Sequence, residues 1–365
     1  MAALWAVNAM ACVPVTRFGP DRVEPGWRAY LGSPRHDASA GESLAVEPRT
    51  RWRQDAGRAV PGTPAVAAGV IAVGTSDRSV VLLDRATGQL LWRRGVPGPV
   101  AGGPLLDGEL LYVATQAVPD GRLLALQLRT GKTAWRVNTG GITAPLALSA
   151  GLVIAATDGG AVVAVDRTSG AERWRRALKA GVRAAPIPTA QGIAVATIGD
   201  TLYLLDAATG SITARLPTPG TVLGTPATDG RRVYLATTSG RVLAVDLPAL
   251  DVAWERSVDE AVYGAPALVG DTLYVTNAAG TLWRIPVGSP AEARSLPLHL
   301  ATTAGPTPLA DGILVAGVSG EVLCVGAGNA VRWRLRRPGP MTEPPLVRDG
   351  QLVLVAGDGR VEVLQ

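Results

Sequence analysis

The sequence predicts an all-β protein: a closed eight-bladed β-propeller in which every blade is a four-stranded antiparallel sheet. Three observations favour this fold. A motif recurs every 39 to 43 residues, and short apolar runs alternate with turns rich in glycine and aspartate. A surplus strand near the start of the chain also matches a strand that is missing at its end. Repeats of this length are typical of folds that grow by adding supersecondary units.

The repeat unit is clearest between residues 143 and 174. Two apolar runs, 152–156 and 161–165, flank a turn that contains Asp158-Gly159-Gly160, and a second turn at 166–170 leads to Trp174. Asp, Ser and Thr side chains bond nearby backbone amides in such turns, and glycine accepts the positive φ that hairpins require. The pattern therefore predicts four short strands joined as a meander.

Two landmarks recur eight times along the chain. The fourth-strand landmark falls at residues 52, 92, 135, 174, 214, 254, 294 and 333. The proline that opens each unit falls at residues 64, 104, 145, 186, 226, 266, 306 and 345. The unit after Pro345 ends at its third strand, whereas the strand around Trp52 precedes the first opening proline. The strand around Trp52 is therefore expected to complete the last blade, which closes the ring and leaves no open sheet edge.

Composition narrows the classes of function. The formal charge is +5 and the pI is near 9.6, a balance that can indicate an acidic partner. Arginines such as Arg93 and Arg136 directly follow the repeated tryptophans, so they are interpreted as solvated strand ends and no nucleic-acid partner is expected. No run of about 18 apolar residues predicts a membrane-spanning helix. Two cysteines exclude a disulfide scaffold.

The repeat resembles the PQQ-like repeat family of β-propellers. The strand of residues 240–246 and the turn and strand of residues 84–92 carry the resemblance. Residues 27–37 are similar to the segment that precedes the first blade in that family. The resemblance covers about residues 26–365, which we expect to form one propeller domain after a leader and linker at residues 1–25.

The resemblance implies that the repeated tryptophan docks between neighbouring blades. A buried indole contributes a large apolar area, provided that its N–H finds an acceptor. Ala214 and Arg294 stand at the tryptophan position in two units, and the contacts between blades are expected to be weakest there. The tryptophans assigned to structural docking are Trp52, Trp92, Trp135, Trp174, Trp254 and Trp333.

An enzymatic function is the most specific alternative to a structural role, because the family also includes quinoprotein dehydrogenases. The resemblance implies that such enzymes use adjacent cysteines, calcium ligands and a catalytic aspartate, whereas Cys12 and Cys324 are far apart and most aspartates lie in turns. His36 and His299 are the only histidines, which leaves little for a metal site or a proton relay. We expect no catalytic residues, no cofactor and no metal.

Other family members are cofactor-free lipoproteins, and their likeness implies a periplasmic scaffold of the machinery that inserts β-barrels into the outer membrane. Ala9-Met10-Ala11-Cys12 resembles a lipobox in which Cys12 is lipidated, although Ala9 replaces the preferred leucine and no Lys or Arg precedes the apolar stretch. The expected protein is a monomeric, periplasm-facing propeller, bound to the outer membrane by its lipid anchor alone. Its expected partner is the barrel-assembly protein.

Two alternatives stay open: an accessory or sensor protein of the cell envelope, and a PQQ-dependent dehydrogenase. The candidate partner-binding residues form one basic stretch of the sequence, with a solvated basic edge as the alternative interpretation. They are Arg175, Arg176, Lys179 and Arg183.

Overall fold

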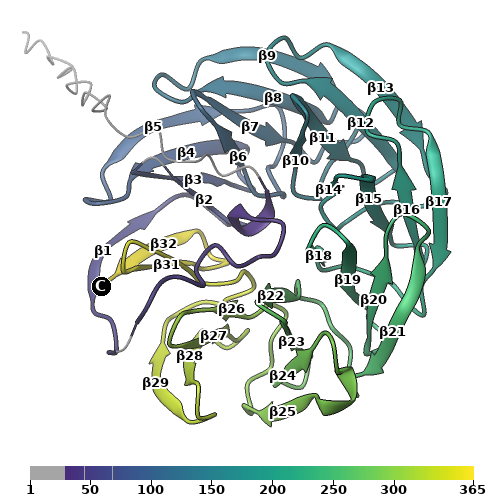
Figure 1. Cartoon of the computed structure of the whole chain (residues 1–365). Helices are drawn as coiled ribbons and strands as arrows, with labels where there is room; N and C mark the ends of the chain where they lie inside the picture. Colours follow the sequence, from purple (N-terminus) through teal and green to yellow (C-terminus); the bar gives the residue numbers. More distant parts are fainter. Residues whose placement is uncertain (1–28, 45, 68) are drawn as a thin grey trace, which may run out of the picture.

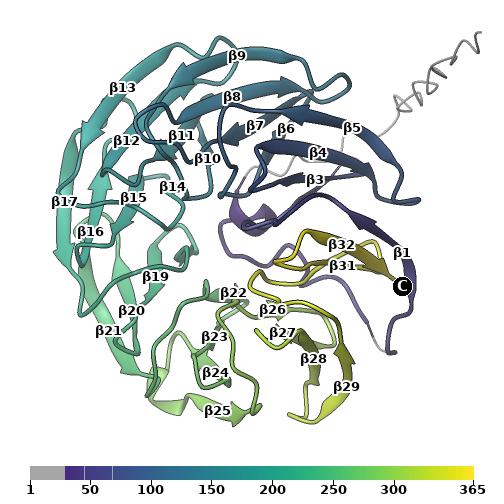
Figure 2. The ribbon, with the colours of Figure 1, turned by 180° about the vertical axis from the view of Figure 1, so that it is seen from behind.

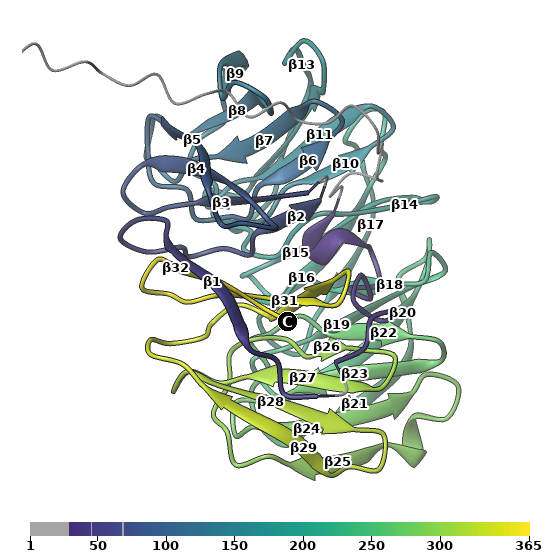
Figure 3. The ribbon, with the colours of Figure 1, turned by 90° about the vertical axis from the view of Figure 1, so that its left-hand side faces the viewer.

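A computed structural model describes residues 29–44, 46–67 and 69–365. Eight four-stranded antiparallel sheets stand around a common axis (Figures 1 and 2), so the predicted fold class is confirmed. Figure 3 shows the same ring of blades from the side. Within the described residues, none of the helical segments is long and apolar enough to cross a membrane.

The blades are numbered in chain order, and the strands of each blade are named from the innermost, next to the axis, to the outermost. Blades 1 and 2 consist of β2 (Ala65–Ala67), β3 (Val70–Gly74), β4 (Ser79–Asp84) and β5 (Leu90–Gly95), then β6 (Leu105–Asp107), β7 (Leu110–Ala114), β8 (Arg122–Gln127) and β9 (Thr133–Asn138). Blades 3 and 4 consist of β10 (Ala147–Ser149), β11 (Leu152–Ala156), β12 (Ala161–Asp166) and β13 (Glu172–Ala177), then β14 (Ile187–Thr189), β15 (Gly192–Thr197), β16 (Thr201–Leu205) and β17 (Ile212–Pro217).

The second half of the ring repeats this order. Blades 5 and 6 consist of β18 (Ala227–Thr228), β19 (Arg232–Ala236), β20 (Arg241–Asp246) and β21 (Asp251–Ser257), then β22 (Ala267–Val269), β23 (Thr272–Thr276), β24 (Thr281–Pro286) and β25 (Arg294–Pro297). Blades 7 and 8 consist of β26 (Thr307–Pro308), β27 (Gly312–Ala316), β28 (Glu321–Gly326) and β29 (Val331–Arg336), then β30 (Leu346–Arg348), β31 (Gln351–Val355), β32 (Arg360–Leu364) and β1 (Thr50–Asp55). Two single-turn 3₁₀ helices are η1 (Tyr30–Gly32) and η2 (Pro290–Glu292).

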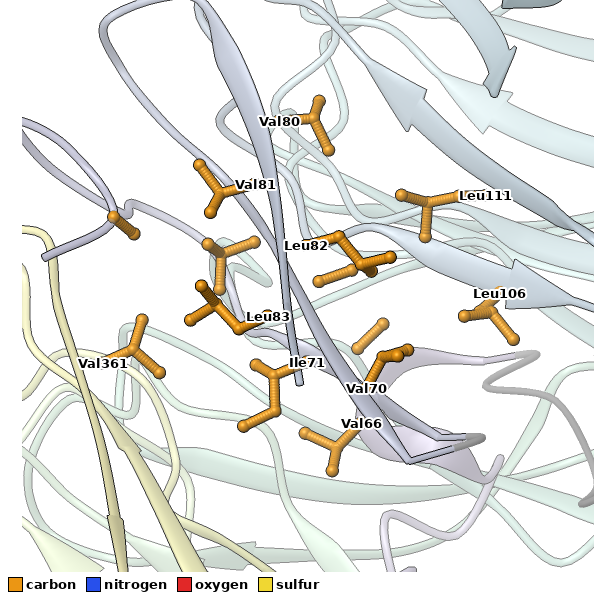
Figure 4. Packing of buried hydrophobic residues seen from close by; sticks show 14 of the residues in the cluster. Val66, Val70, Ile71, Val80, Val81, Leu82, Leu83, Leu106, Leu111 and Val361 are labelled. Carbon is orange, nitrogen blue, oxygen red and sulfur yellow. The ribbon is translucent and has the colours of Figure 1, made fainter. Parts of the chain in front are cut away.

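The middle strands of the blades are buried on both faces. In β4, Val81 and Leu83 point toward the side of Val361 in blade 8, and Leu82 points toward Leu111 in blade 2 (Figure 4). Successive side chains of a strand alternate between the faces of its sheet, so a continuous apolar run fills the space on both sides. The core is therefore a ring of layers between blades, which explains why the middle strands carry few polar residues.

The ring closes as predicted. Strand β1 pairs antiparallel with β32, with Trp52 opposite Val363 and Arg53 opposite Glu362. The Arg53 guanidinium also lies 3.0 Å from the Glu362 carboxylate. Blade 8 is thus assembled from both ends of the propeller domain. Strand β32 is paired on both of its edges, with β31 on one side and β1 on the other.

Residues 29–44, which we term the strap, cross one face of the ring before β1 begins. The carbonyl oxygen of Pro34 accepts a hydrogen bond from Thr228 N, and that of Arg35 accepts one from Leu268 N. Further along, the Ser39 hydroxyl and the Val347 backbone exchange two hydrogen bonds. The strap therefore joins the inner strands of blades 5, 6 and 8 (Figures 1 and 2, where η1 is the purple turn near the centre).

Six of the eight joints between successive blades contain an indole from the outermost strand. In each, the indole N–H donates to a backbone carbonyl, and in five joints that carbonyl belongs to the turn between the third and fourth strands of the next blade. In four of these five joints a glycine of that turn lies against the indole ring: a Cβ added to Gly210 would be 2.4 Å from Cε3 of Trp174. The six donor–acceptor pairs are Trp52–Arg85, Trp92–Leu128, Trp135–Arg167, Trp174–Ala207, Trp254–Val287 and Trp333–Leu44, at 2.7 to 3.2 Å.

The two joints without this indole are filled in other ways. Between blades 4 and 5, Leu250 replaces the turn glycine, keeps its positive φ of 62°, and is buried in the apolar cluster that Ala214 packs against. Between blades 6 and 7, the Arg284 guanidinium donates to the carbonyl oxygens of Gly326 and Ala327, each at 3.3 Å. Neither joint is left empty, and the expectation that these two joints are the weakest of the ring stays a prediction.

Candidate binding site at the central channel

The channel along the propeller axis is lined by the segments that lead into the first strands. The position two residues before the opening proline is occupied by a small residue in seven blades. These residues are Gly62, Gly102, Thr143, Ala184, Gly224, Gly264 and Ala304, and the eighth is Glu343.

Close contact between backbones explains the small residues. A Cβ added to Gly224 would lie 2.3 Å from the carbonyl oxygen of Gly264, and one added to Gly264 would lie 2.4 Å from the nitrogen of Gly305. Successive segments therefore touch through their main chains around the axis. Glu343 departs from this rule and brings a carboxyl group to a place where the other blades carry at most a hydroxyl.

A cavity of about 170 Å³ lies at this point of the channel. Tyr30 of the strap, Tyr263 and Glu343 contribute side chains to its lining, together with Arg183. The Arg183 guanidinium lies 3.6 Å from the Asp158 carboxylate, so its charge is compensated there. The strap therefore contributes directly to the lining of this cavity.

Burial sets the protonation of the groups in the cavity. It raises the pKa of Glu343 to about 8, so the carboxyl group is mostly protonated at neutral pH in the absence of a cation. Burial, and secondarily the charge of Glu343, raise the pKa of Tyr30 well above its ordinary value. Two acidic groups therefore share the cavity, and both favour their neutral forms.

His36 supports Tyr30 from within the strap. The two rings meet edge to face with centroids 5.2 Å apart. The Nδ1 atom of His36 lies 2.7 Å from the carbonyl oxygen of Pro266, so we assign the proton to Nδ1 because a carbonyl only accepts. Burial lowers the pKa of His36 to about 4, which keeps the imidazole neutral.

The four basic residues singled out in the sequence do not form one patch. Arg175 donates to the carbonyl oxygens of Asn138 and Thr139 in blade 2, whereas Arg176 donates to that of Gly210 in blade 4. Arg183 lies at the central cavity, and Lys179 lines a separate shallow groove beside β16 and β17. Arg176 extends the contact that Trp174 makes with the next blade.

The two cysteines and two residues of blade 6 complete the comparison with the sequence. Cys12 lies outside the described residues. Cys324 is buried within β28, and burial raises the pKa of its thiol to about 11, which disfavours the reactive thiolate. The landmark series did not include Trp283 or Arg284, which lie on the third strand of blade 6.

The sequence matches one protein family, described as outer membrane protein assembly factor BamB, through four overlapping segments: residues 40–180, 119–213, 158–285 and 280–365. The chain belongs to this family. The resemblance to PQQ-like repeat propellers is thereby confirmed. Family membership covers all eight blades, including the parts in which the tryptophan landmark is absent.

Individual relatives of two kinds match shorter stretches. BamB of Nitrosomonas eutropha is 32% identical over 149 residues, which is 38% of this chain and 35% of that protein. The dehydrogenase subunit of the quinone alcohol dehydrogenase of Gluconacetobacter polyoxogenes is 36% identical over 97 residues, 23% of this chain and 13% of that protein. The matches thus span about a third or less of the length of these curated relatives.

Solved structures show the same fold. The crystal structure of BamB from Moraxella catarrhalis matches 87% of this chain and 100% of its own, with a TM-score of 0.75 and 19% identity. The quinohemoprotein alcohol dehydrogenase ADHIIG from Pseudomonas putida HK5 matches 93% of this chain and 80% of its own, with a TM-score of 0.74 and 14% identity. The fold of this chain is therefore shared by BamB and by a quinohemoprotein alcohol dehydrogenase.

The enzyme relatives raise the question of whether the central cavity could hold a quinone with calcium. Sites for ligands of that size usually measure about 300–1,000 Å³, against about 170 Å³ here. Glu343 is the single carboxylate of the lining, and the described residues contain no cluster of three or more metal-ligating side chains. The residues around the cavity do not fit a quinone–calcium pair.

Proposed function

We propose that this member of the BamB family is a non-enzymatic, protein-binding scaffold in the assembly of outer-membrane β-barrel proteins. The family match across residues 40–365 carries the proposal. The fold match to the whole of the Moraxella catarrhalis BamB chain agrees with it. The proposed partner is the outer-membrane barrel-assembly protein, and the propeller is proposed to act as a monomer.

The architecture suits a scaffold. Eight joints, each filled by an indole, a leucine or a guanidinium, hold the blades in fixed positions, while the loops between strands emerge on the two faces. Loops on a rigid frame are common carriers of binding residues. We further propose that residues 1–25 form a leader and linker, and that lipidation of Cys12 holds the propeller at the periplasmic side of the outer membrane.

A PQQ-dependent dehydrogenase is the second candidate, and the 36% identity to an alcohol dehydrogenase subunit over 97 residues favours it. That match covers only 13% of the enzyme's length, and the size of the cavity argues against a bound quinone. A general accessory or sensor protein of the cell envelope would use the same fold without the barrel-assembly partner.

Affinity purification of the full chain from solubilised envelopes of the bacterium that encodes it tests the proposal. We expect the barrel-assembly protein to co-purify, and a propeller of unrelated sequence serves as the control. Its reproducible absence from the purified material would contradict the proposed partner. Addition of PQQ, calcium and an alcohol tests the second candidate, because electron transfer to a dye would identify an enzyme.

The lipid anchor needs a separate test. A Cys12→Ser variant should move from the membrane fraction to the soluble periplasmic fraction, while a Cys324→Ser variant, altered at the buried cysteine, should stay at the membrane if it folds. Release of neither variant, together with an unlipidated mass for the wild type, would overturn the anchor without affecting the scaffold proposal.

A further inference from the structure

Glu343 is the exception to the small residues that stand two positions before the opening prolines. Seven blades place Gly, Ala or Thr at the same position, and close packing of main chains explains that choice. Glu343 is only partly exposed, and a carboxyl group that is largely removed from water without a partner destabilises a protein. Its presence at the axis therefore calls for a reason other than packing.

Within the described residues, the Glu343 side chain forms no hydrogen bond and no ion pair. By contrast, the buried Glu362 contacts two arginines, and Asp311 accepts hydrogen bonds from Ser43 and Leu44. Acidic groups with strongly altered titration, located in a cavity, are candidates for functional sites.

We propose that the central cavity binds a cationic group of side-chain size, an ammonium or a guanidinium, through the Glu343 carboxylate with the rings of Tyr30 and Tyr263 beside it. This proposal does not depend on the scaffold role. The cation would supply the charge and the hydrogen-bond donors that Glu343 lacks. Aromatic faces attract cations in addition, most strongly where water is excluded.

The size and charge of the cavity select this class of ligand. A cavity of about 150 Å³ is large enough to hold benzene, so about 170 Å³ accommodates a single side chain or a small amine. Arg183, the basic group of the lining, is paired with Asp158. An anion would find no uncompensated positive charge in the lining, because Arg183 is paired, and a divalent metal would find a single carboxylate.

Binding is coupled to loss of a proton from Glu343. The carboxyl group of the free protein has a pKa of about 8, and only its ionised form attracts the cation. Because the apparent affinity falls with the fraction of the competent form, affinity should rise about tenfold from pH 7 to pH 9. His36 and Tyr30 stay neutral over this range, since their pKa values lie far below and above it.

Titration calorimetry of the full chain with methylguanidinium chloride tests the site, because this probe stays charged at every pH used. We expect saturable binding, release of about one proton at pH 7 but little at pH 9, and the tenfold rise in affinity with pH that ionisation implies. Glu343→Gln should weaken binding at least tenfold and abolish its pH dependence. Glu260→Gln, which neutralises an exposed acid, is the matched control and should bind like the wild type.

Either of two results of the titration would overturn the proposal: equal binding by the wild type and Glu343→Gln, or no saturable binding by the wild type. Glu343→Ala, which introduces the residue of blades 4 and 7, provides a second variant in case the glutamine disturbs folding. n-Butylammonium and a short peptide with one lysine distinguish a free amine from a basic side chain as the natural source of the cation.

Arg28 lies outside the described residues and close in sequence to Tyr30, so the chain's own guanidinium must be tested as the occupant. If Arg28→Ala alone gains the binding that the wild type lacks, the site is an internal salt bridge, and the proposal of an external ligand fails. If the wild type and Arg28→Ala bind alike, the ligand comes from outside.

Discussion

The joint between blades 3 and 4 and the joint between blades 4 and 5 perform the same task with different residues. In the first, the Trp174 indole lies against Gly210 and donates to the carbonyl oxygen of Ala207 at 3.0 Å. In the second, Ala214 stands in place of the tryptophan and Leu250 in place of the glycine. The large side chain has moved to the opposite blade, while the joint remains filled.

This difference teaches that the joint is specified by a pair of positions. Gly210 has a φ of 67° and Leu250 a φ of 62°, so the turn keeps one backbone conformation with either residue. Leucine in this region is strained relative to glycine. The strain is accepted because Leu250, only 3% exposed, fills space that an alanine on the other side would leave.

The largest effect should follow from emptying an indole-filled joint. Trp174→Ala removes a ring that is 8% exposed and leaves the Ala207 carbonyl without its donor. We expect a loss of about 3–5 kcal/mol in the free energy of unfolding. Denaturant unfolding measures it, and Arg173→Ala, at an exposed neighbour on the same strand, should lose under about 1 kcal/mol. A similar loss in both variants would contradict the assigned role of the indole.

The strap should make an acid-sensitive contribution to stability instead, because it buries His36 against Pro266 of blade 6. The folded protein holds the pKa of His36 at about 4, below the ordinary value of about 6.5 expected in the unfolded chain. The contribution of neutral His36 to the free energy of unfolding is therefore fully present above pH 6.5. It decreases by about 3 kcal/mol as the pH drops toward 4.

Unfolding curves at pH 7, 5.5 and 4 check this prediction. His36→Asn keeps an amide donor and a residue that tolerates positive φ, so its stability should depend much less on pH over this range. Parallel curves for the wild type and this variant would show that His36 does not govern the acid sensitivity.

A smaller effect is expected at the joint between blades 6 and 7. Arg284→Met retains the apolar stem and removes the two hydrogen bonds to Gly326 and Ala327. These bonds are long, at 3.3 Å, so we expect a loss of about 1 kcal/mol. Thermal unfolding measures it; a loss as large as that of Trp174→Ala would mean that the guanidinium carries this joint to the same degree as an indole.

Much of the architecture was predictable because proline, glycine and tryptophan each mark one place in the repeat. The two landmark series predicted the eight blades, and the position of Trp52 predicted which blade both ends of the chain complete. The pairing of Ala214 with Leu250 was not predictable in this way. Each departure is visible in the sequence, but only the structure shows that the two positions meet across a joint.

The candidate site was less accessible to sequence reasoning. Glu343 could have been noticed as the one acid in a position otherwise reserved for small residues. Its partial burial, and its proximity to Tyr30 from the opposite end of the chain, depend on how the strap crosses the ring. Conversely, the run from Arg175 to Arg183 suggested a patch, but alternation along β13 directs Arg175 and Arg176 to different blades.

The most direct test of this account of the joints exchanges the pair of residues between blades 4 and 5. Ala214→Trp alone should destabilise the protein because the new ring meets Leu250, and Leu250→Gly alone should destabilise it by leaving a cavity. The double variant recreates the pair seen at Trp174 and Gly210. We predict that its loss of stability is smaller than the sum of the two single losses by about 0.5–3 kcal/mol, whereas strictly additive losses would contradict the account.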